Sequence, residues 1–184
     1  MRPAATLLLS IAAISLPAQP QETSATRPPR FEDYPVTEIF QGKPAAPILA
    51  TAEQRMYRTR IREGVSMGIG VERDGKQDQP GPNFAGHYII ITFGCGSPCT
   101  LMAMVDAVTG KVYNSPMAQG LQMSWLDGGP WLPKVAFRQN SRLMIMEPCP
   151  NLPRGPLYTH YFVWENDHWN LVRKIPLQSE PHRP

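Results

Sequence analysis

The sequence has few of the residues on which catalytic motifs depend. Only three of its 184 residues are cysteine and four are histidine, and charged residues make up 18% of the chain. Gly-x-Ser-x-Gly, Gly-x-x-x-x-Gly-Lys-Ser/Thr and His-Glu-x-x-His patterns are all missing. These patterns mark α/β-hydrolases, phosphate-binding loops and zinc proteases respectively. The sequence therefore shows no recognisable catalytic set, and we expect no cofactor and no bound metal.

A strong charge of either sign is also lacking. The formal net charge is +3, and the densest basic stretch, residues 55–62, is flanked by Glu53 and Glu63. A nucleic-acid-binding domain usually carries a clustered basic face. We interpret these arginines as a solvated helix face and expect no nucleic-acid partner.

Long hydrophobic runs are missing except at the beginning of the chain. Arg2 precedes an apolar run over residues 4–16, and Ala18 supplies a small residue shortly after it. This arrangement is typical of a secretory signal peptide. The run is shorter than the roughly 20 residues that a bilayer-spanning helix needs. We expect residues 1–18 to be a signal peptide, the protein to be periplasmic or extracellular, and the mature chain to have no membrane span.

The rest of the chain suits one domain. Residues 19–47 are rich in proline, threonine and charge, which predicts an extended or mobile segment. Residues 48–176 are expected to form a single β-rich globular domain, and residues 177–184 a flexible tail.

A helix is predicted over residues 52–63. Thr51 is a favourable N-cap, and Gln54 completes a capping box with it. Gly64 is expected to end this helix. Residues 65–71 fit either an irregular continuation or a short strand.

Most of the remaining pattern indicates strands. Apolar and β-branched runs occupy residues 87–93, 101–107, 123–125, 134–137, 143–146, 157–165 and 169–175, and residues 106–113 are typical of a strand, a turn and a second strand. Gly110 suits one tight turn between them, and the segment around Asn166, Asp167 and His168 suits another. Consecutive short strands with tight turns build antiparallel sheets. We predict an α+β fold in which a predominantly antiparallel β meander of about six to eight short strands packs against one N-terminal helix.

Three cysteines allow one intramolecular disulfide and leave one cysteine over. Exposed thiols pair by default in an oxidising compartment. Cys95 and Cys99 flank a short turn that can bring their Cα atoms within the roughly 4.4–6.8 Å that a disulfide needs. We predict a Cys95–Cys99 bridge, with Cys149 as the alternative partner of either residue and free thiols as the remaining alternative.

His87 is the principal candidate for acid–base chemistry. In an extended strand it shares a face with Ile89, Ile91 and Phe93, because side chains alternate with a period of two. One interpretation is a buried histidine that satisfies nearby backbone groups. The other is a histidine that lines a pocket.

Asp106 and Asn83 complete the candidate acid–base set. Asp106 precedes the Thr109-Gly110 turn, and its carboxylate is expected to accept backbone N–H groups there. Paired with His87, and with Asn83 nearby, it would form the proton-transfer group of a hydrolase.

The turn after the first strand is the candidate binding surface. Gly94, Gly96 and Ser97 surround Cys95 and fit either a plain tight turn or a nest of N–H groups that binds an anion. A partner would meet this turn or an exposed aromatic side chain.

Three groups of residues together resemble a known family. They are the string GPNFAGHY at residues 81–88, the Gly-Cys-Gly of residues 94–96 with Cys99, and Asp106 followed by TGKVY at residues 109–113. In this order they resemble a family of small exported bacterial proteins without an assigned function, over about residues 59–164. Relatives often have tryptophan where this chain has Phe93. The resemblance implies export, a bacterial source and a compact β-rich domain, and it supplies no catalytic residue.

Taken together, these features favour an exported binding or inhibitor-type domain. Its partner would be a protein or a small ligand of the cell envelope. A periplasmic hydrolase that uses His87 with Asp106 is the alternative hypothesis. A thiol-redox or metal-linked role for Cys95 and Cys99 is the third, although the three intervening residues differ from the two that thiol oxidoreductases use.

Overall fold

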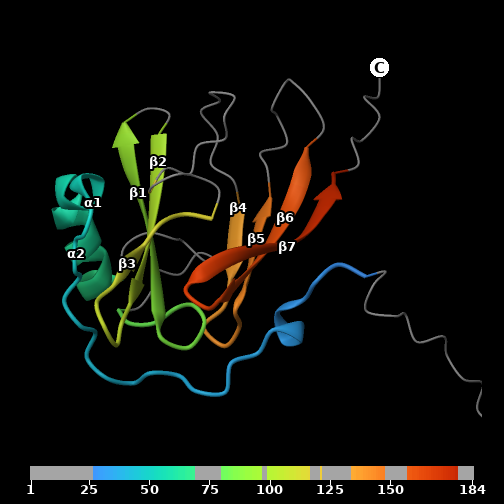
Figure 1. Cartoon of the computed structure of the whole chain (residues 1–184), viewed down its shortest axis with the longest axis horizontal. Coiled ribbons are helices and arrows are strands. Elements are labelled where there is room, and N and C mark those ends of the chain that lie inside the picture. Colours follow the sequence, from blue (N-terminus) through green and yellow to red (C-terminus); the bar gives the residue numbers. More distant parts are fainter. Residues whose placement is uncertain are drawn as a thin grey trace, which may run out of the picture.

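A computed structural model describes residues 27–68, 80–96, 99–116, 121, 134–147 and 157–177. In these ranges seven strands form two antiparallel sheets, and two α-helices precede them (Figure 1). The predicted β-rich antiparallel character is therefore confirmed, whereas the single meander is replaced by two sheets. The strand predicted at residues 123–125, the signal peptide and the tail from residue 178 lie outside the described residues.

The first sheet has the order β1-β2-β3. β1 (Tyr88–Gly96) pairs with β2 (Cys99–Asp106), and β2 pairs with β3 (Val112–Tyr113). The predicted tight turn joins β2 to β3, because Gly110 N donates to the carbonyl oxygen of Asp106 at 2.8 Å. Gly110 has a φ of +79°, a conformation that glycine adopts without steric cost.

The second sheet has the order β4-β5-β6-β7. Its strands are β4 (Lys134–Phe137), β5 (Leu143–Glu147), β6 (Tyr158–Glu165) and β7 (His168–Pro176). Asn166 and Asp167 alone form the β6–β7 turn, with φ values of +51° and +63°. Two consecutive left-handed residues are the type I′ geometry that matches the twist of a hairpin.

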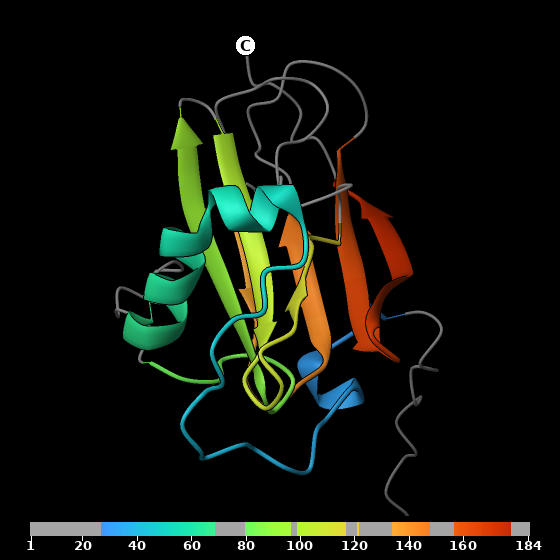
Figure 2. The same cartoon turned by 60° about the vertical axis from the view of Figure 1, so that its left-hand side comes forward.

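The two sheets pack face to face. Alternate side chains of β1 and β2 meet the inner face of the second sheet, and bury a core that includes Phe84, Tyr88, Ile90, Met102, Met104, Phe137, Met144, Met146, Phe162 and Trp164. The opposite face of the first sheet is covered by the helices (Figure 2). The molecule therefore has three layers, in the order helices, first sheet and second sheet.

The predicted helix is in fact two helices. α1 (Ala52–Met56) begins at the predicted N-cap, where Thr51 Oγ1 accepts from Gln54 N at 3.1 Å, so the capping box is confirmed. Tyr57 separates α1 from α2 (Arg58–Met67). The helices are not N-terminal either, because residues 27–50 are described before them. Among the described helices, none is long and apolar enough to cross a membrane.

Gly64 does not end the helix, contrary to the prediction. A Cβ atom at this position would meet the side chain of Ile91, so glycine is what allows α2 to lie close to β1. The helix instead ends at Gly68, whose φ of +70° places it in the left-handed region. Residues 65–67 are thus helical, and residues 69–71 lie outside the described part.

An extended segment, which we call the strap (residues 35–48), connects both sheets. Its backbone N–H groups donate to carbonyl oxygens beside each sheet: Val36 to Asn140, Phe40 to Gly86, Ala45 to Ala107 and Ile48 to Gly110. Before the strap, the 3-10 turn η1 (Phe31–Asp33) brings Phe31 and Tyr34 against the outer face of the second sheet. The strap is therefore hydrogen-bonded along its length, and it forms one wall of the site described next.

Candidate functional site

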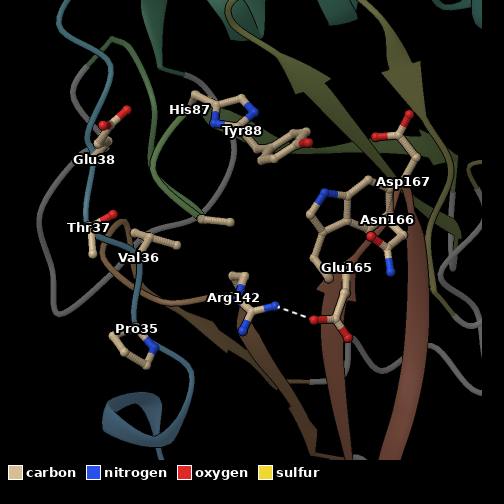
Figure 3. Close-up of a pocket in the computed structure, with 12 residues that line it drawn as sticks. Pro35, Val36, Thr37, Glu38, His87, Tyr88, Arg142, Glu165, Asn166 and Asp167 are labelled. Atoms are coloured by element: carbon tan, nitrogen blue, oxygen red, sulfur yellow. Dashed lines mark hydrogen bonds and ion pairs between the residues drawn. The ribbon is translucent and has the colours of Figure 1, made fainter.

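A groove opens where the strap, the loop before β1 and the β6–β7 turn meet (Figure 3). It has a volume of about 630 Å³. Residues 35–38 form one side, and Asn166 and Asp167 face them from the other. The groove is lined by Pro35, Val36, Thr37, Glu38, Ala85, His87, Tyr88, Arg142, Trp164, Glu165, Asn166 and Asp167.

The loop before β1 is fixed from several directions. Ala85 and Gly86 both have positive φ values, +43° and +82°. Their N–H groups donate to the carbonyl oxygens of Ser141 at 3.2 Å and Gln139 at 2.7 Å. The loop therefore joins the first sheet to the β4–β5 turn, and the floor of the groove is built on hydrogen-bonded backbone.

Asn83 is occupied by the first strand. Its Oδ1 accepts from Ile90 N at 2.8 Å, and its Nδ2 donates to Ile90 O at 3.0 Å. The side chain therefore satisfies both backbone groups of one β1 residue. Asn83 does not line the groove, so the structure does not bring it together with His87.

His87 lies in the turn just before β1 and lines the groove. The predicted shared face with Ile89 and Ile91 is wrong, because those side chains pack in the helix-facing core. The imidazole instead packs on the Tyr88 ring at a centroid distance of 4.2 Å, and 39% of its side chain is exposed. Of the two interpretations, the structure favours the pocket residue over the buried histidine.

Asp106 serves mainly to close the turn after β2. Its Oδ1 accepts from Val108 N at 2.8 Å, and its Oδ2 accepts from Thr109 Oγ1 at 2.6 Å, which confirms the predicted cap. His87 Nε2 is 3.8 Å from Asp106 Oδ1, too far for a hydrogen bond. The two candidate residues are thus neighbours without forming a hydrogen-bonded dyad.

Lys111, Tyr113 and Asp167 form a cluster beside the groove that sequence reasoning missed. Lys111 Nζ is 2.8 Å from Asp167 Oδ2 and 4.6 Å from the centroid of the Tyr113 ring. Burial, followed by the hydrogen bond to Asp167, raises the pKa of Tyr113 to about 12. The hydrogen bond between Lys111 and Asp167 lowers the pKa of the carboxyl and raises the pKa of the ammonium.

A second hollow, which we call the side groove, adjoins the first. It also measures about 630 Å³ and is lined by Ile48, Ala50, Asp106, Thr109, Lys111, Val112, Tyr113 and Asp167. Asp167 lines both hollows. The Asn166-Asp167 turn and the motif containing Lys111 were each visible in the sequence. Their pairing was not visible, because it depends on how the two sheets pack.

The remaining charged side chains of the groove include one ion pair and one carboxylate on the strap. Arg142 Nη1 donates to Glu165 Oε1 at 2.8 Å, as Figure 3 shows. Glu38 is exposed on the strap and makes no hydrogen bond or ion pair with any residue that the structure describes. The Trp164 ring, which also lines the groove, packs against the rings of Tyr88 and Tyr113 at centroid distances of 5.5 and 4.8 Å.

The β1–β2 turn lies at the other end of β1 from the groove. Gly94 is exposed, with no atom within 4 Å of the position that a Cβ would take, and Gly96 pairs with Cys99 next to a bulge. Cys95 packs at the edge of the helix-facing core. Ser97, Cys149 and the side chain of Cys99 lie outside what the structure describes, so the disulfide stays a prediction. In the described ranges, no group of three or more His, Cys, Asp or Glu side chains is arranged to hold a metal ion.

Comparisons with known proteins do not assign the chain to a family. No family model matches it, and no match was found among curated proteins or solved structures. The resemblance to small exported bacterial proteins therefore stays a prediction that depends on the motif string alone.

Proposed function

We propose that this protein is a binding module that recognises its partner at the groove. The observation that carries the proposal is the direction of the pKa shifts at four groups in and beside the groove, namely Tyr88, Lys111, Tyr113 and Asp167. A catalytic acid or base works best when its pKa lies near the working pH. Active sites therefore shift pKa values toward neutrality.

In and beside this groove, pKa values are instead shifted away from neutrality. The pKa of Asp167 is lowered by its bond to Lys111, and that of Lys111 is raised. Burial raises the pKa of Tyr88 and brings that of Tyr113 to about 12. These groups keep one charge state across the physiological range, which suits recognition better than proton transfer.

The groove is also built to keep its shape. Its walls come from the strap, the loop at Ala85 and the Asn166-Asp167 turn, and the first two are joined to the rest by backbone hydrogen bonds. A preformed site costs less conformational entropy on binding than a site that must order itself.

We further propose that the protein is exported and that Cys95 pairs with Cys99. The signal-like segment supports export. The bulge at Cys95, with Gly96 opposite Cys99 in the ladder, supports the pairing because it puts the two cysteines in adjoining positions of one hairpin.

A groove-filling substitution tests the proposal. Thr37 is exposed on the groove wall, so Thr37→Trp should fill the groove and reduce the recovery of partners from cell-envelope extract. Thr59→Trp places the same residue on the exposed face of α2 and should leave recovery unchanged. Gly94→Trp tests the β1–β2 turn in the same way, because nothing lies within 4 Å of a Cβ there. Equal recovery by wild type and Thr37→Trp would remove the groove from the interface.

A hydrolase that uses His87 is the second candidate. It is favoured by one observation, namely the partly exposed imidazole in the groove with Asp106 Oδ1 at 3.8 Å. Hydrolysis of p-nitrophenyl acetate by the wild type, lost in His87→Gln and retained in His168→Gln, would support this function over binding alone. His168 is exposed at the start of β7 and serves as the matched control.

A further inference from the structure

We propose that the groove receives a lysine side chain of a protein partner, and that this ammonium docks on Asp167 in place of Lys111. The inference rests on the proposed binding function and specifies its ligand. It follows from four features of the groove: a carboxylate on a strand-paired turn, an aromatic face, an exchangeable internal ammonium and an excess of acidic side chains.

The internal ammonium shows what chemistry this position accepts. Lys111 Nζ is held by the Asp167 carboxylate at 2.8 Å and lies 4.6 Å from the centroid of the Tyr113 ring. A carboxylate and an aromatic face together are the usual surroundings of a bound cation. This chain therefore already places one lysine side chain at the junction of the two grooves.

The internal pair is also easy to exchange. Both side chains are 55% exposed, and exposed ion pairs contribute little because water competes for each charge. Lys111 comes from the β2–β3 turn and Asp167 from the β6–β7 turn, so neither sheet depends on this contact for its strand pairing. An incoming ammonium can replace Lys111 without moving a strand.

The carboxylate itself is well positioned. Asp167 is the second residue of a two-residue turn in which both backbone conformations are left-handed, and that turn is fixed by the pairing of Glu165 with His168. The backbone of Asp167 therefore stays at the boundary of the groove when the partner of its carboxylate changes. A ligand can reach Asp167 without any change in this turn, because Asp167 already lines both hollows.

The charges of the groove favour a cation. Its lining includes the carboxylates of Glu38, Glu165 and Asp167 against the guanidinium of Arg142, although the chain as a whole has a net charge of +3. Arg142 is already paired with Glu165. Glu38, on the opposite wall from Asp167, has no ion-pair partner in the described part of the chain. It would meet the same ligand from the other side.

Two substitutions should have opposite effects on binding. Lys111→Met keeps the aliphatic stem and removes the internal competitor, so an ammonium ligand should bind about two- to fivefold more tightly. Asp167→Asn keeps the left-handed turn and removes the negative charge, so the same ligand should bind more weakly. If the Lys111–Asp167 pair had only a structural role, the two substitutions would change ligand affinity in the same direction, because each breaks the same contact.

The experiment is a titration with Nα-acetyl-lysine N-methylamide, and with the uncharged norleucine analogue as the comparison. Binding is followed by the backbone amide shifts of residues 165–168 in the wild type, Lys111→Met, Asp167→Asn and Lys174→Met. Lys174, on β7, is the matched control. Its Nζ lies 4.2 Å from the centroid of the Tyr158 ring, and it lines neither groove. Thermal unfolding of each variant verifies that it is folded.

We expect the lysine probe to shift these amides more than the norleucine probe, with affinity in the order Lys111→Met, wild type equal to Lys174→Met, and Asp167→Asn. Equal responses to both probes, or the same change in Lys111→Met and Asp167→Asn, would overturn the lysine inference and leave groove binding standing. No response to either probe would also overturn it. Whether the groove binds a partner at all is tested separately, by the recovery of partners with Thr37→Trp.

Discussion

Gly86 shows how much of the site depends on single backbone positions. It has a φ of +82°, and a Cβ atom there would meet the carbonyl oxygen of Glu38 on the strap. The strap wall can lie against the loop before β1 only because this residue has no side chain. The neighbouring Ala85, at a φ of +43°, adopts a conformation that costs most residues about 1 kcal/mol or more.

We therefore expect Gly86→Ala to destabilise the protein by about 2 kcal/mol or more, since strain and collision act together. Gly81→Ala is the matched control, because Gly81 also has a positive φ, +113°, with nothing within 4 Å of an added Cβ. It should cost less than Gly86→Ala, because it adds backbone strain, on the order of 1–3 kcal/mol, without a collision. Urea denaturation measures both. Equal losses of unfolding free energy in the two variants would mean that the collision with the strap does not contribute to the destabilisation by Gly86→Ala.

The cysteines give a second prediction at this scale. If Cys95 pairs with Cys99, the unreduced and denatured protein should have one free thiol per chain, and Cys149→Ser should have none. Reaction with Ellman's reagent in guanidinium measures this number. A Cys149→Ser protein that still yields a free thiol would point to a bridge through Cys149 or to reduced cysteines.

Sequence patterns predicted the roles of residues whose hydrogen-bond partners are close along the chain. Asp106 caps its own turn and Gln54 completes the capping box, and both roles involve residues within three positions. His87 was assigned to the wrong surroundings, because the alternation rule assumed that the strand began one residue earlier than it does. The Lys111–Asp167 pair joins positions 56 residues apart, and no local pattern encodes such a contact.

At the scale of elements, the contact between α2 and β1 controls where the helix runs. Gly64 faces Ile91, and the buried stripe of α2 also includes Ile61 and Val65. Sequence rules read Gly64 as a stop because glycine is a poor helix former. Tertiary packing outweighed that preference, since the glycine lets two elements approach.

Gly64→Ala should therefore destabilise the protein by about 1 kcal/mol, because overpacking exceeds the gain in helix propensity. In an Ile91→Ala background, which vacates the contact, the same substitution should be stabilising. Ser66→Ala, on the exposed face of α2, should be nearly neutral in both backgrounds. Thermal and urea unfolding of the double-mutant cycle measures the coupling. Additive effects of the two substitutions would contradict this account of the helix.

At the scale of the whole molecule, residues 27–34, which precede the strap, attach to parts of the second sheet that are distant in sequence. Ser141 Oγ donates to the carbonyl oxygen of Phe31 at 2.8 Å, and Arg138 pairs with Glu32 at the same distance. Composition predicts an extended or mobile segment over residues 19–47, since proline and charge disfavour regular structure. It could not indicate where the segment lies, because its partners belong to β-turns more than 100 residues later.

Acid should weaken the attachment of this segment. Hydrogen bonds from Arg27, and then from the Arg30 backbone, lower the pKa of Asp33 to about 2 from an ordinary value of 3.8. A depressed folded-state pKa stabilises the protein above the unfolded-state pKa, and this contribution is lost as the pH falls through the folded value. Between about pH 4 and pH 2, the stability of wild type should thus fall more than that of Asp33→Asn.

The check is denaturant unfolding at several pH values across that interval, with Glu147→Gln as the control. Glu147 is an exposed acid on β5 with no described ion pair. Identical pH profiles for wild type and Asp33→Asn would show that the Arg27 contact does not stabilise the fold.

The long reach of this segment also has a consequence for the order of folding. Arg173 on β7 donates to the carbonyl oxygen of Arg27, a contact between residues 146 positions apart. A ribosome releases the N-terminal residues first, yet their binding surface exists only after nearly the whole chain has been made. Contacts of such sequence separation form late, because loop closure must precede any gain from them. The contact between Arg27 and Arg173 would thus be among the last to form, and a nascent chain would display the first sheet before this contact exists.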